Sequence, residues 1–294
     1  MTSDELAALK GMLVANPFDF TIPAQEVRAQ FNGAVATFPV AENLAFTEKT
    51  IGGVSGLWMD APGSNNVMLF IHGGAMLVGT AEVYRGLTGN IAAAAGVNHF
   101  SIDYRLAPEH AFPAALDDSI AAYKGLLSEG YKAEQIIVAG DSAGGGLALG
   151  LLLSLKAAGI PQPAGAVLLS PWADLTHSGE SMTTQAQADV SLTLAGLESG
   201  ASQYLQGHPA NDPLVSGVFA DLAGLPPLLI EVGTTEILHS DSTRIRDNAK
   251  AAGVDVTFHE WTDMPHDWSL FSFMLSEGRD MIEEVGAWIK TKVA

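Results

Sequence analysis

The sequence predicts an α/β fold with a mostly parallel central sheet that helices cover on both faces. Short, continuously apolar runs alternate with segments of helical period over most of the chain, and strands without polar alternation are typical of parallel sheets buried on both faces. The 294 residues, 48% of them hydrophobic, are enough for one large core. We therefore expect one α/β domain over residues 1–294.

Each expected strand is an apolar run, rich in β-branched residues, that ends in a loop. In chain order these runs lie at 67–71, 99–104, 135–139, 164–169, 227–232 and 254–258. The helices expected between and after them lie near 113–127, 144–158, 240–252 and 280–292. Repeated strand–helix alternation of this kind indicates a mostly parallel sheet.

Residues 1–36 and 173–222 do not follow this alternation. Breaks at Asn16-Pro17 and Ile22-Pro23 divide the first stretch into two short helices. The second contains no convincing strand and mixes Thr, Gln, Ala and Gly with moderate helix formers. We expect both stretches to form a helical cap over the strand ends, where open α/β sheets bind ligands. Two ordinary surface decorations are the alternative.

One serine stands at a strand-to-helix junction, in Gly140-Asp141-Ser142-Ala143-Gly144. A nucleophile on so tight a turn needs strained dihedral angles, so small residues must flank it. The turn lifts the Ser142 hydroxyl clear of the sheet edge and directs the first helix amides to the point where negative charge would develop. By itself the pattern also fits a turn without chemistry.

A glycine loop, His72-Gly73-Gly74-Ala75, follows the first expected strand. Adjacent glycines let the backbone bend sharply and bring its amides close to a ligand. We expect the oxyanion of an acyl-transfer intermediate to be bound by the amide of Ala143 and by two of the amides of Gly73, Gly74 and Ala75. A plain glycine turn is the alternative.

Of the eight histidines, His266 is the candidate general base. It lies in the loop after the last expected strand, at a carboxyl end from which it could reach the serine. We expect His72 to support the glycine loop and His99 to lie in the core. The others fall in a Pro-rich loop, in the expected cap, at a helix start and in a strand: His110, His177, His208, His239 and His259. A structural role for His266 is the alternative.

The carboxylate that orients the base is expected in the loop after the strand at 227–232, where Glu236 lies. Asp241 is the rival, but it stands at a helix start, where carboxylates cap free amides. Glu231 lies within the strand and is a poorer candidate. The order Ser142, Glu236, His266 is the chain order of triads on α/β folds of this kind.

Three motifs occur together: the glycine loop, the serine turn extended to Gly145, and Asp103-Tyr104-Arg105-Leu106-Ala107-Pro108-Glu109. In combination they resemble the hormone-sensitive-lipase-like family of α/β-hydrolases, the bacterial esterases often called family IV. The resemblance extends through Pro171-Trp172 to His266. It implies an α/β-hydrolase fold with a helical cap, Ser142 as nucleophile, His266 as base and the amide of Ala143 as an oxyanion donor.

Two positions depart from the family's pattern. Ala75 replaces the third glycine of His-Gly-Gly-Gly, and we expect its methyl group to narrow the acyl pocket. Glu236, in Glu236-Ile237-Leu238, stands where the commoner acid is an aspartate followed by Pro-Leu, although a glutamate there is known in the family. We interpret the Asp103–Glu109 motif as structural, with buried Asp and Arg fixing loops by paired hydrogen bonds. Trp172 is expected to pack near the site without taking part in catalysis.

Composition excludes several other classes of protein. A chain without cysteine has no disulfides, cysteine nucleophile or thiolate metal site. Its net charge of −19 disfavours nucleic acid and anionic membranes as partners. No apolar run approaches 18 residues, and the acidic start Met1–Glu5 lacks the plan of a signal peptide. We expect a soluble, cytoplasmic protein.

These observations predict a serine carboxylesterase that works through an acyl-enzyme and needs no metal or organic cofactor. The resemblance implies short- to medium-chain esters as substrates and a homodimer through the sheet edge near residues 254–259. A lactone hydrolase, or a deacetylase of a small natural product with the same triad, is the alternative. A non-catalytic small-molecule receptor would have lost the serine or the histidine, and this chain keeps both.

Overall fold

The computed structural model describes residues 3–293, which form a mixed sheet of eight strands. The strands lie side by side in the order β1-β2-β4-β3-β5-β6-β7-β8. They are β1 (Thr47–Ile51), β2 (Val54–Met59), β3 (Val67–Ile71), β4 (Asn98–Ile102), β5 (Ile136–Asp141), β6 (Gly165–Leu169), β7 (Leu228–Gly233) and β8 (Val256–Trp261). Strands β3 to β8 run parallel to one another, which confirms the predicted mostly parallel sheet.

All six expected strands are present, with shifted ends. The largest shift is in β8, which begins two residues later than expected and continues to Trp261. Strands β1 and β2, which pair antiparallel at one edge, were not expected from the apolar pattern. Strand β1 is mostly exposed and polar, so it gives no apolar run. Its detectable signal was the turn Gly52-Gly53, where both φ angles are positive, as two-residue hairpins require.

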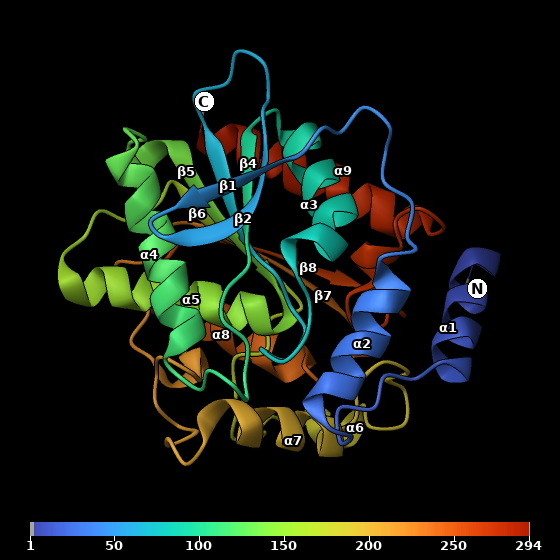
Figure 1. The fold of residues 1–294 in the computed structure, drawn as a ribbon. Helices are drawn as coiled ribbons and strands as arrows, with labels where there is room; N and C mark the ends of the chain where they lie inside the picture. The colour runs from blue at the N-terminus through green and yellow to red at the C-terminus, as the bar shows by residue number, and fades with distance from the viewer. Residues whose placement is uncertain (1–2, 294) are drawn as a thin grey trace.

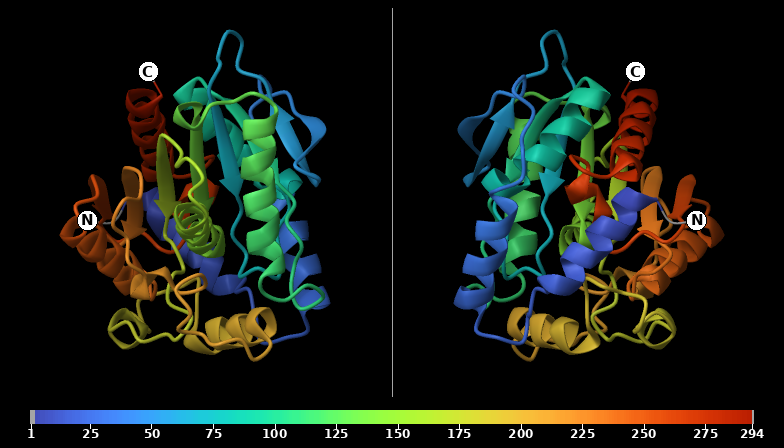
Figure 2. Two further views of the ribbon diagram at one scale, coloured as in Figure 1. Left: turned by 90° about the vertical axis from the view of Figure 1, so that its left-hand side faces the viewer. Right: turned by 90° about the vertical axis from the view of Figure 1, so that its right-hand side faces the viewer.

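The helices cover both faces of the sheet (Figures 1 and 2). They are α1 (Asp4–Ala15), α2 (Ala24–Val35), α3 (Ala81–Ala95), α4 (Ala114–Ser128), α5 (Ser142–Ala158), α6 (Ser181–Thr184), α7 (Leu194–Leu205), α8 (His239–Ala251) and α9 (Ser276–Lys292). Helix α3 packs against α9, and α4 packs against α5 on the opposite face. Short 3₁₀ helices lie at Ala133–Gln135, Gly217–Phe219 and Trp268–Phe271.

The expected helices are confirmed, although α9 begins four residues earlier than expected. Helix α3 was not expected from the apolar spacing. Both of its ends carry a local signal: the Thr80 side chain accepts a hydrogen bond from the amide of Val83, and Gly96 ends the helix in the left-handed conformation. A search for caps, in addition to apolar spacing, would have found this helix.

Helix α5 is the structural support of the site. It is buried along most of its length, from Ser142 to Leu155, and a helix that is apolar on all sides belongs to the core. Its first residue directly follows β5, the fifth strand in the sheet order. The junction is therefore held in place by packing on every side.

Residues 3–36 and 173–222, which do not follow the strand–helix alternation, contain helices and no strands. They supply α1 and α2 from the N-terminal stretch, and α6 and α7 from residues 173–222. Figures 1 and 2 place α2, α6 and α7 at the same end of the sheet. Among residues 3–293, no helix has the length and apolar character needed to cross a membrane.

Candidate active site

The turn between β5 and α5 holds Ser142 in a strained conformation, as expected, with φ at +50°. The flanking glycines are required by close backbone approaches. A Cβ on Gly144 would lie 2.0 Å from the carbonyl oxygen of Ile71, and one on Gly140 would lie 2.3 Å from the carbonyl oxygen of Gly144. Since real Cβ contacts are much longer, only glycine fits at these positions.

Ser142, His266 and Glu236 are brought together by hydrogen bonds. Ser142 Oγ lies 2.9 Å from His266 Nε2, and His266 Nδ1 lies 2.8 Å from Glu236 Oε2. All three side chains are buried. They come from the loops that follow β5, β8 and β7, whose carboxyl ends meet at one edge of the sheet. A ring that donates from Nδ1 to Glu236 can accept the serine proton at Nε2.

The Glu236 carboxylate is held by three donors. Besides His266, Ser170 Oγ donates to Oε1 over 2.7 Å and the amide of Gly233 donates over 2.5 Å. Burial raises the pKa of Glu236 above its usual value, and these hydrogen bonds oppose the rise. Ser170 was not among the expected site residues. Its one signal in the sequence is its position directly after the strand β6, and its φ in the structure is +43°.

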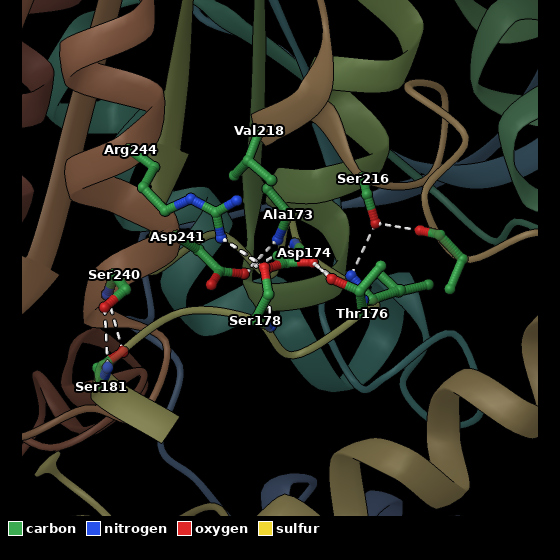
Figure 3. A network of polar contacts seen from close by, with 12 residues as sticks. Ala173, Asp174, Thr176, Ser178, Ser181, Ser216, Val218, Ser240, Asp241 and Arg244 are labelled. Carbon is green, nitrogen blue, oxygen red and sulfur yellow. Dashed lines mark hydrogen bonds and ion pairs between the residues drawn. The ribbon is translucent and has the colours of Figure 1, made fainter. Parts of the chain in front are cut away.

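Asp241, the rival acid, has other partners. Its Oδ2 accepts the amides of Ala173 and Asp174 at 2.8 and 2.9 Å (Figure 3). Our expectation that it caps the start of its own helix is therefore wrong, because the amides that it binds belong to the loop after β6. Burial raises the pKa of Asp241 to about 8. Glu231 is likewise occupied, by His259 Nδ1 and by the indole NH of Trp261.

The residues around Asp241 form a network that ties the loop after β6 to α8 (Figure 3). Asp174 accepts hydrogen bonds from Ser178 and Arg244. Ser181 and Ser240 each donate a backbone amide to the hydroxyl of the other. Since α8 directly follows the Glu236 loop, this network supports the position of Glu236 from outside the site.

The glycine loop offers fewer free amides than expected. The amide of Gly73 donates to Asp141 Oδ1 over 2.8 Å, so our inclusion of Gly73 among the oxyanion donors is corrected. The amides of Gly74, Ala75 and Ala143 have no acceptor within residues 3–293. Ala75 adopts a φ of +54°, a conformation that suits the glycine usual at this position better.

Aromatic stacking supports the glycine loop, as expected for His72. Its ring is stacked with those of Tyr84 and Tyr104, at 5.3 and 4.3 Å between centroids, and its Nδ1 lies 2.8 Å from the carbonyl oxygen of Gly73. Burial lowers the pKa of His72 to about 4, so the ring stays neutral. His99 is buried in β4 as expected, and burial lowers its pKa to about 3.

The Asp103–Glu109 motif fixes loops, but from the surface. Asp103 and Arg105 are exposed, which corrects our expectation that they are buried. Asp103 accepts the amide of Ala81 at the start of α3, and Arg105 pairs with Asp118 in α4. At the end of the motif, the carboxylate of Glu109 pairs with Arg28 of α2. The motif thus joins three helices around the glycine loop.

A cavity of about 80 Å³ opens onto Ser142 and His266. Apolar side chains from α1, α2, the segments that follow these two helices, and the segment before and within α7 make up much of its wall: Leu13, Phe18, Phe20, Phe31, Val35, Phe38, Leu192 and Leu197. Ala75 and Trp172 also line it, as expected. Three of its lining residues, Val35, Phe38 and Leu270, also border a second cavity of about 660 Å³.

One group of described residues has the spacing of a metal site. Ligand atoms of Glu231, His259 and Glu284 lie within 4.8 Å of one another. His259 Nδ1 lies 2.9 Å from Glu231 and 3.2 Å from Glu284. These contacts account for the carboxylates without an ion, and none of the three residues lines the cavity at Ser142.

Comparison with known proteins identifies the family of this chain. Residues 68–270 match the family described as alpha/beta hydrolase fold. An acetyl-hydrolase of Streptomyces hygroscopicus is 42% identical, over 82% of this chain and 81% of its own. An esterase of Acinetobacter venetianus is 34% identical, over 92% and 90%. A solved esterase from the bacterial hormone-sensitive lipase family superposes with a TM-score of 0.95 at 38% identity, covering 100% of both chains.

The close backbone approach at Gly144 predicts that Gly144→Ala destabilises the fold by more than about 3 kcal/mol, because the new methyl group has no space between β3 and α5. Thermal unfolding measures the effect. Gly33→Ala is the matched control. Its methyl group meets nothing within 4 Å in α2, so it should stabilise by about 0.5–1 kcal/mol. Equal unfolding temperatures for the two variants would contradict this account of the turn.

Proposed function

Because this chain belongs to the α/β-hydrolase family, among its hormone-sensitive-lipase-like esterases, we propose that it hydrolyses esters through Ser142, His266 and Glu236. It is a carboxylic ester hydrolase. The observation that carries the proposal is the pair of hydrogen bonds at His266, 2.9 Å to Ser142 Oγ and 2.8 Å to Glu236 Oε2. A nucleophile, its base and an orienting acid in this arrangement are what acyl transfer requires.

In the proposed reaction, Ser142 Oγ attacks the ester carbonyl carbon while His266 Nε2 takes the hydroxyl proton. The resulting oxyanion binds the amides of Ala143 and the glycine loop, where Gly74 and Ala75 have no internal acceptor. Breakage of the bond to the ester's alkoxy oxygen leaves an acyl-enzyme, and His266 gives its proton to that oxygen, which departs as the alcohol. Water then attacks the acyl-enzyme by the same route and releases the carboxylic acid.

Glu236 stabilises the imidazolium that forms in each half of this cycle. Its carboxylate faces Nδ1, and the hydrogen bonds from Ser170 and Gly233 keep it from turning away. The Glu236 side chain, which is longer than that of the commoner aspartate, reaches His266 from this loop, and its other oxygen is bound by Ser170 and Gly233. We propose Glu236, and not Asp241, as the acid of the triad.

We propose that α1, α2 and the segment 173–222 form a cap that selects the ester. Their side chains supply much of the apolar wall around Ser142. The volume of about 80 Å³ favours a short acyl group, and Phe38 lines both this cavity and the second one of about 660 Å³. Cleavage of acetyl groups from a small natural product is a second candidate, favoured by the 42% identity to an acetyl-hydrolase.

The homodimer and the cytoplasmic location remain predictions. The expected dimer segment, residues 254–259, overlaps β8, which is the last strand in the sheet order. An edge strand has unpaired backbone groups that could pair with a second copy.

The role of Ser142 predicts that Ser142→Ala lowers kcat/KM for ester hydrolysis by about four to six orders of magnitude. The measurement is hydrolysis of an ester series from acetyl to decanoyl, with circular dichroism to verify that the variant is folded. A folded Ser142→Ala protein with unchanged activity would exclude the mechanism.

The choice of acid predicts a large difference between Glu236→Gln and Asp241→Asn. Glu236→Gln removes the charge that stabilises the imidazolium, so kcat should fall by up to about four orders of magnitude. Burial raises the pKa of Asp241 to about 8, and its Oδ2 accepts two backbone amides away from His266. Asparagine keeps its size and an amide-accepting oxygen. Steady-state kinetics at pH 7 decide between them, and a larger loss in Asp241→Asn would reverse the assignment.

The position of Phe38 predicts that Phe38→Ala joins the two cavities and favours longer acyl chains. The ratio of kcat/KM for decanoyl over butyryl esters should rise about tenfold or more, since each added methylene that enters an apolar pocket contributes about 0.8 kcal/mol. Phe20→Ala is the control, because Phe20 borders the first cavity but not the second. Identical chain-length profiles for the two variants would contradict this role of Phe38.

A further inference from the structure

A second carboxylate contacts the reacting face of His266. Asp267 Oδ2 lies 3.1 Å from His266 Nε2, the nitrogen that also lies 2.9 Å from Ser142 Oγ. The Asp267 side chain is only 12% exposed and lines the cavity at Ser142. The mechanism proposed above uses Nε2 as an acceptor of the serine proton and leaves this carboxylate without a role.

The backbone holds Asp267 in this position. Its φ is +53°, in the left-handed region that aspartate and asparagine tolerate better than most residues. It immediately precedes the 3₁₀ helix Trp268–Phe271, and its carbonyl oxygen accepts the amide of Leu270. Its other carboxylate oxygen, Oδ1, is buried and has no hydrogen-bond partner within residues 3–293. The ring of His266 is therefore the polar group toward which this carboxylate is directed.

The groups around this contact add no further positive charge. Glu236 faces the opposite nitrogen of His266 from the loop after β7. Asp141, at the end of β5, has a buried Oδ2 without a partner in the described residues. Burial, and then the nearby Asp267 carboxylate, raise the pKa of Asp141 well above its usual range. Burial and the same two aspartates also raise the pKa of Tyr84, from α3, so its hydroxyl stays neutral.

We propose that Asp267 holds the resting His266 in its protonated form, with Glu236 at Nδ1 and Asp267 at Nε2, so that the base becomes available only after this proton has left for solvent. The proposal rests on the proposed function, in which His266 is the general base. A neutral ring would offer no positive charge to a carboxylate 3.1 Å from Nε2. The imidazolium instead pairs electrostatically with this carboxylate, while its Nε2 remains within hydrogen-bond distance of Ser142 Oγ.

The balance of charges agrees with this geometry. Burial of the His266 ring by itself disfavours the charged form, but the carboxylates of Asp267 and Glu236 outweigh it and raise the pKa of His266 well above its usual range. Ester hydrolysis requires the neutral ring. A raised pKa therefore moves the acid limb of the rate profile to higher pH, and removal of Asp267 should move that limb to lower pH.

The test is the pH dependence of kcat/KM for Asp267→Asn, a change that keeps the size of the side chain and tolerates the left-handed backbone. We expect the acid limb of Asp267→Asn to lie about one pH unit or more below that of the unchanged protein. At a pH below both limbs, kcat/KM as a fraction of each protein's own plateau should then be about tenfold higher in the variant. Asp263→Asn is the matched control, because Asp263 lies in the same loop, has a φ of +62° and is exposed. It should leave the limb in place.

A second measurement does not depend on activity. In the Ser142→Ala background, ¹⁵N imidazole shifts report the protonation of His266, with the signal assigned from its loss in His266→Gln. Asp267→Asn should lower the pH midpoint of this titration. An unchanged midpoint, or a loss of activity that is uniform across pH, would overturn the role of Asp267. If the proposed function is wrong, ester hydrolysis survives in Ser142→Ala. The titration of His266 does not depend on activity, so it tests the role of Asp267 separately.

Discussion

The parallel register of β5, β6, β7 and β8 is the constraint on which the site depends. Asp141 is aligned with Leu169, Leu169 with Glu231, and Glu231 with His259. Because these strands end within two residues of this level, the loops after β5, β7 and β8 start from the same edge. Ser142, Glu236 and His266 can then contact one another although 124 residues separate the first from the last. The buried core that aligns the strands thereby also sets the 2.9 Å distance between Ser142 and His266.

Close packing between the glycine loop and the serine turn is the second requirement. The amide of Gly73 donates to Asp141, and Gly144 lies directly beneath the carbonyl oxygen of Ile71. These contacts lock the end of β3 to the start of α5. Strained backbone at Ser142 and Ala75 persists because the surrounding core holds it in place. The free amides of the site are therefore positioned before any substrate arrives, which is how such groups stabilise developing charge.

Buried carboxylates are unusually dense around this site, and each is stabilised in a different way. Glu236 receives hydrogen bonds from a serine, a backbone amide and the histidine. Asp241 binds two backbone amides and supports the neighbouring loops. Asp141 accepts the amide of Gly73 at Oδ1, and burial raises the pKa of its carboxyl group. Asp267 has only the histidine ring as an ion-pair partner among residues 3–293, which is why we infer that it acts on the protonation of that ring.

The sequence by itself determined the parallel sheet, the strained turn at Ser142 and the loops that carry Glu236 and His266. Apolar runs, glycine positions and strand–helix alternation are local patterns, and each reports the conformation of its own segment. The helix caps of α3 at Thr80 and Gly96, and the Gly52-Gly53 turn of the β1–β2 hairpin, are local patterns as well. Tertiary structure alone decided that Gly73 binds Asp141, that Glu236 and not Asp241 lies beside His266, and that Ser170 and Asp267 join the site. These are contacts between segments far apart in the chain, or depend on where the core places a loop. No pattern within one segment specifies which of several carboxylates or amides will face a given nitrogen.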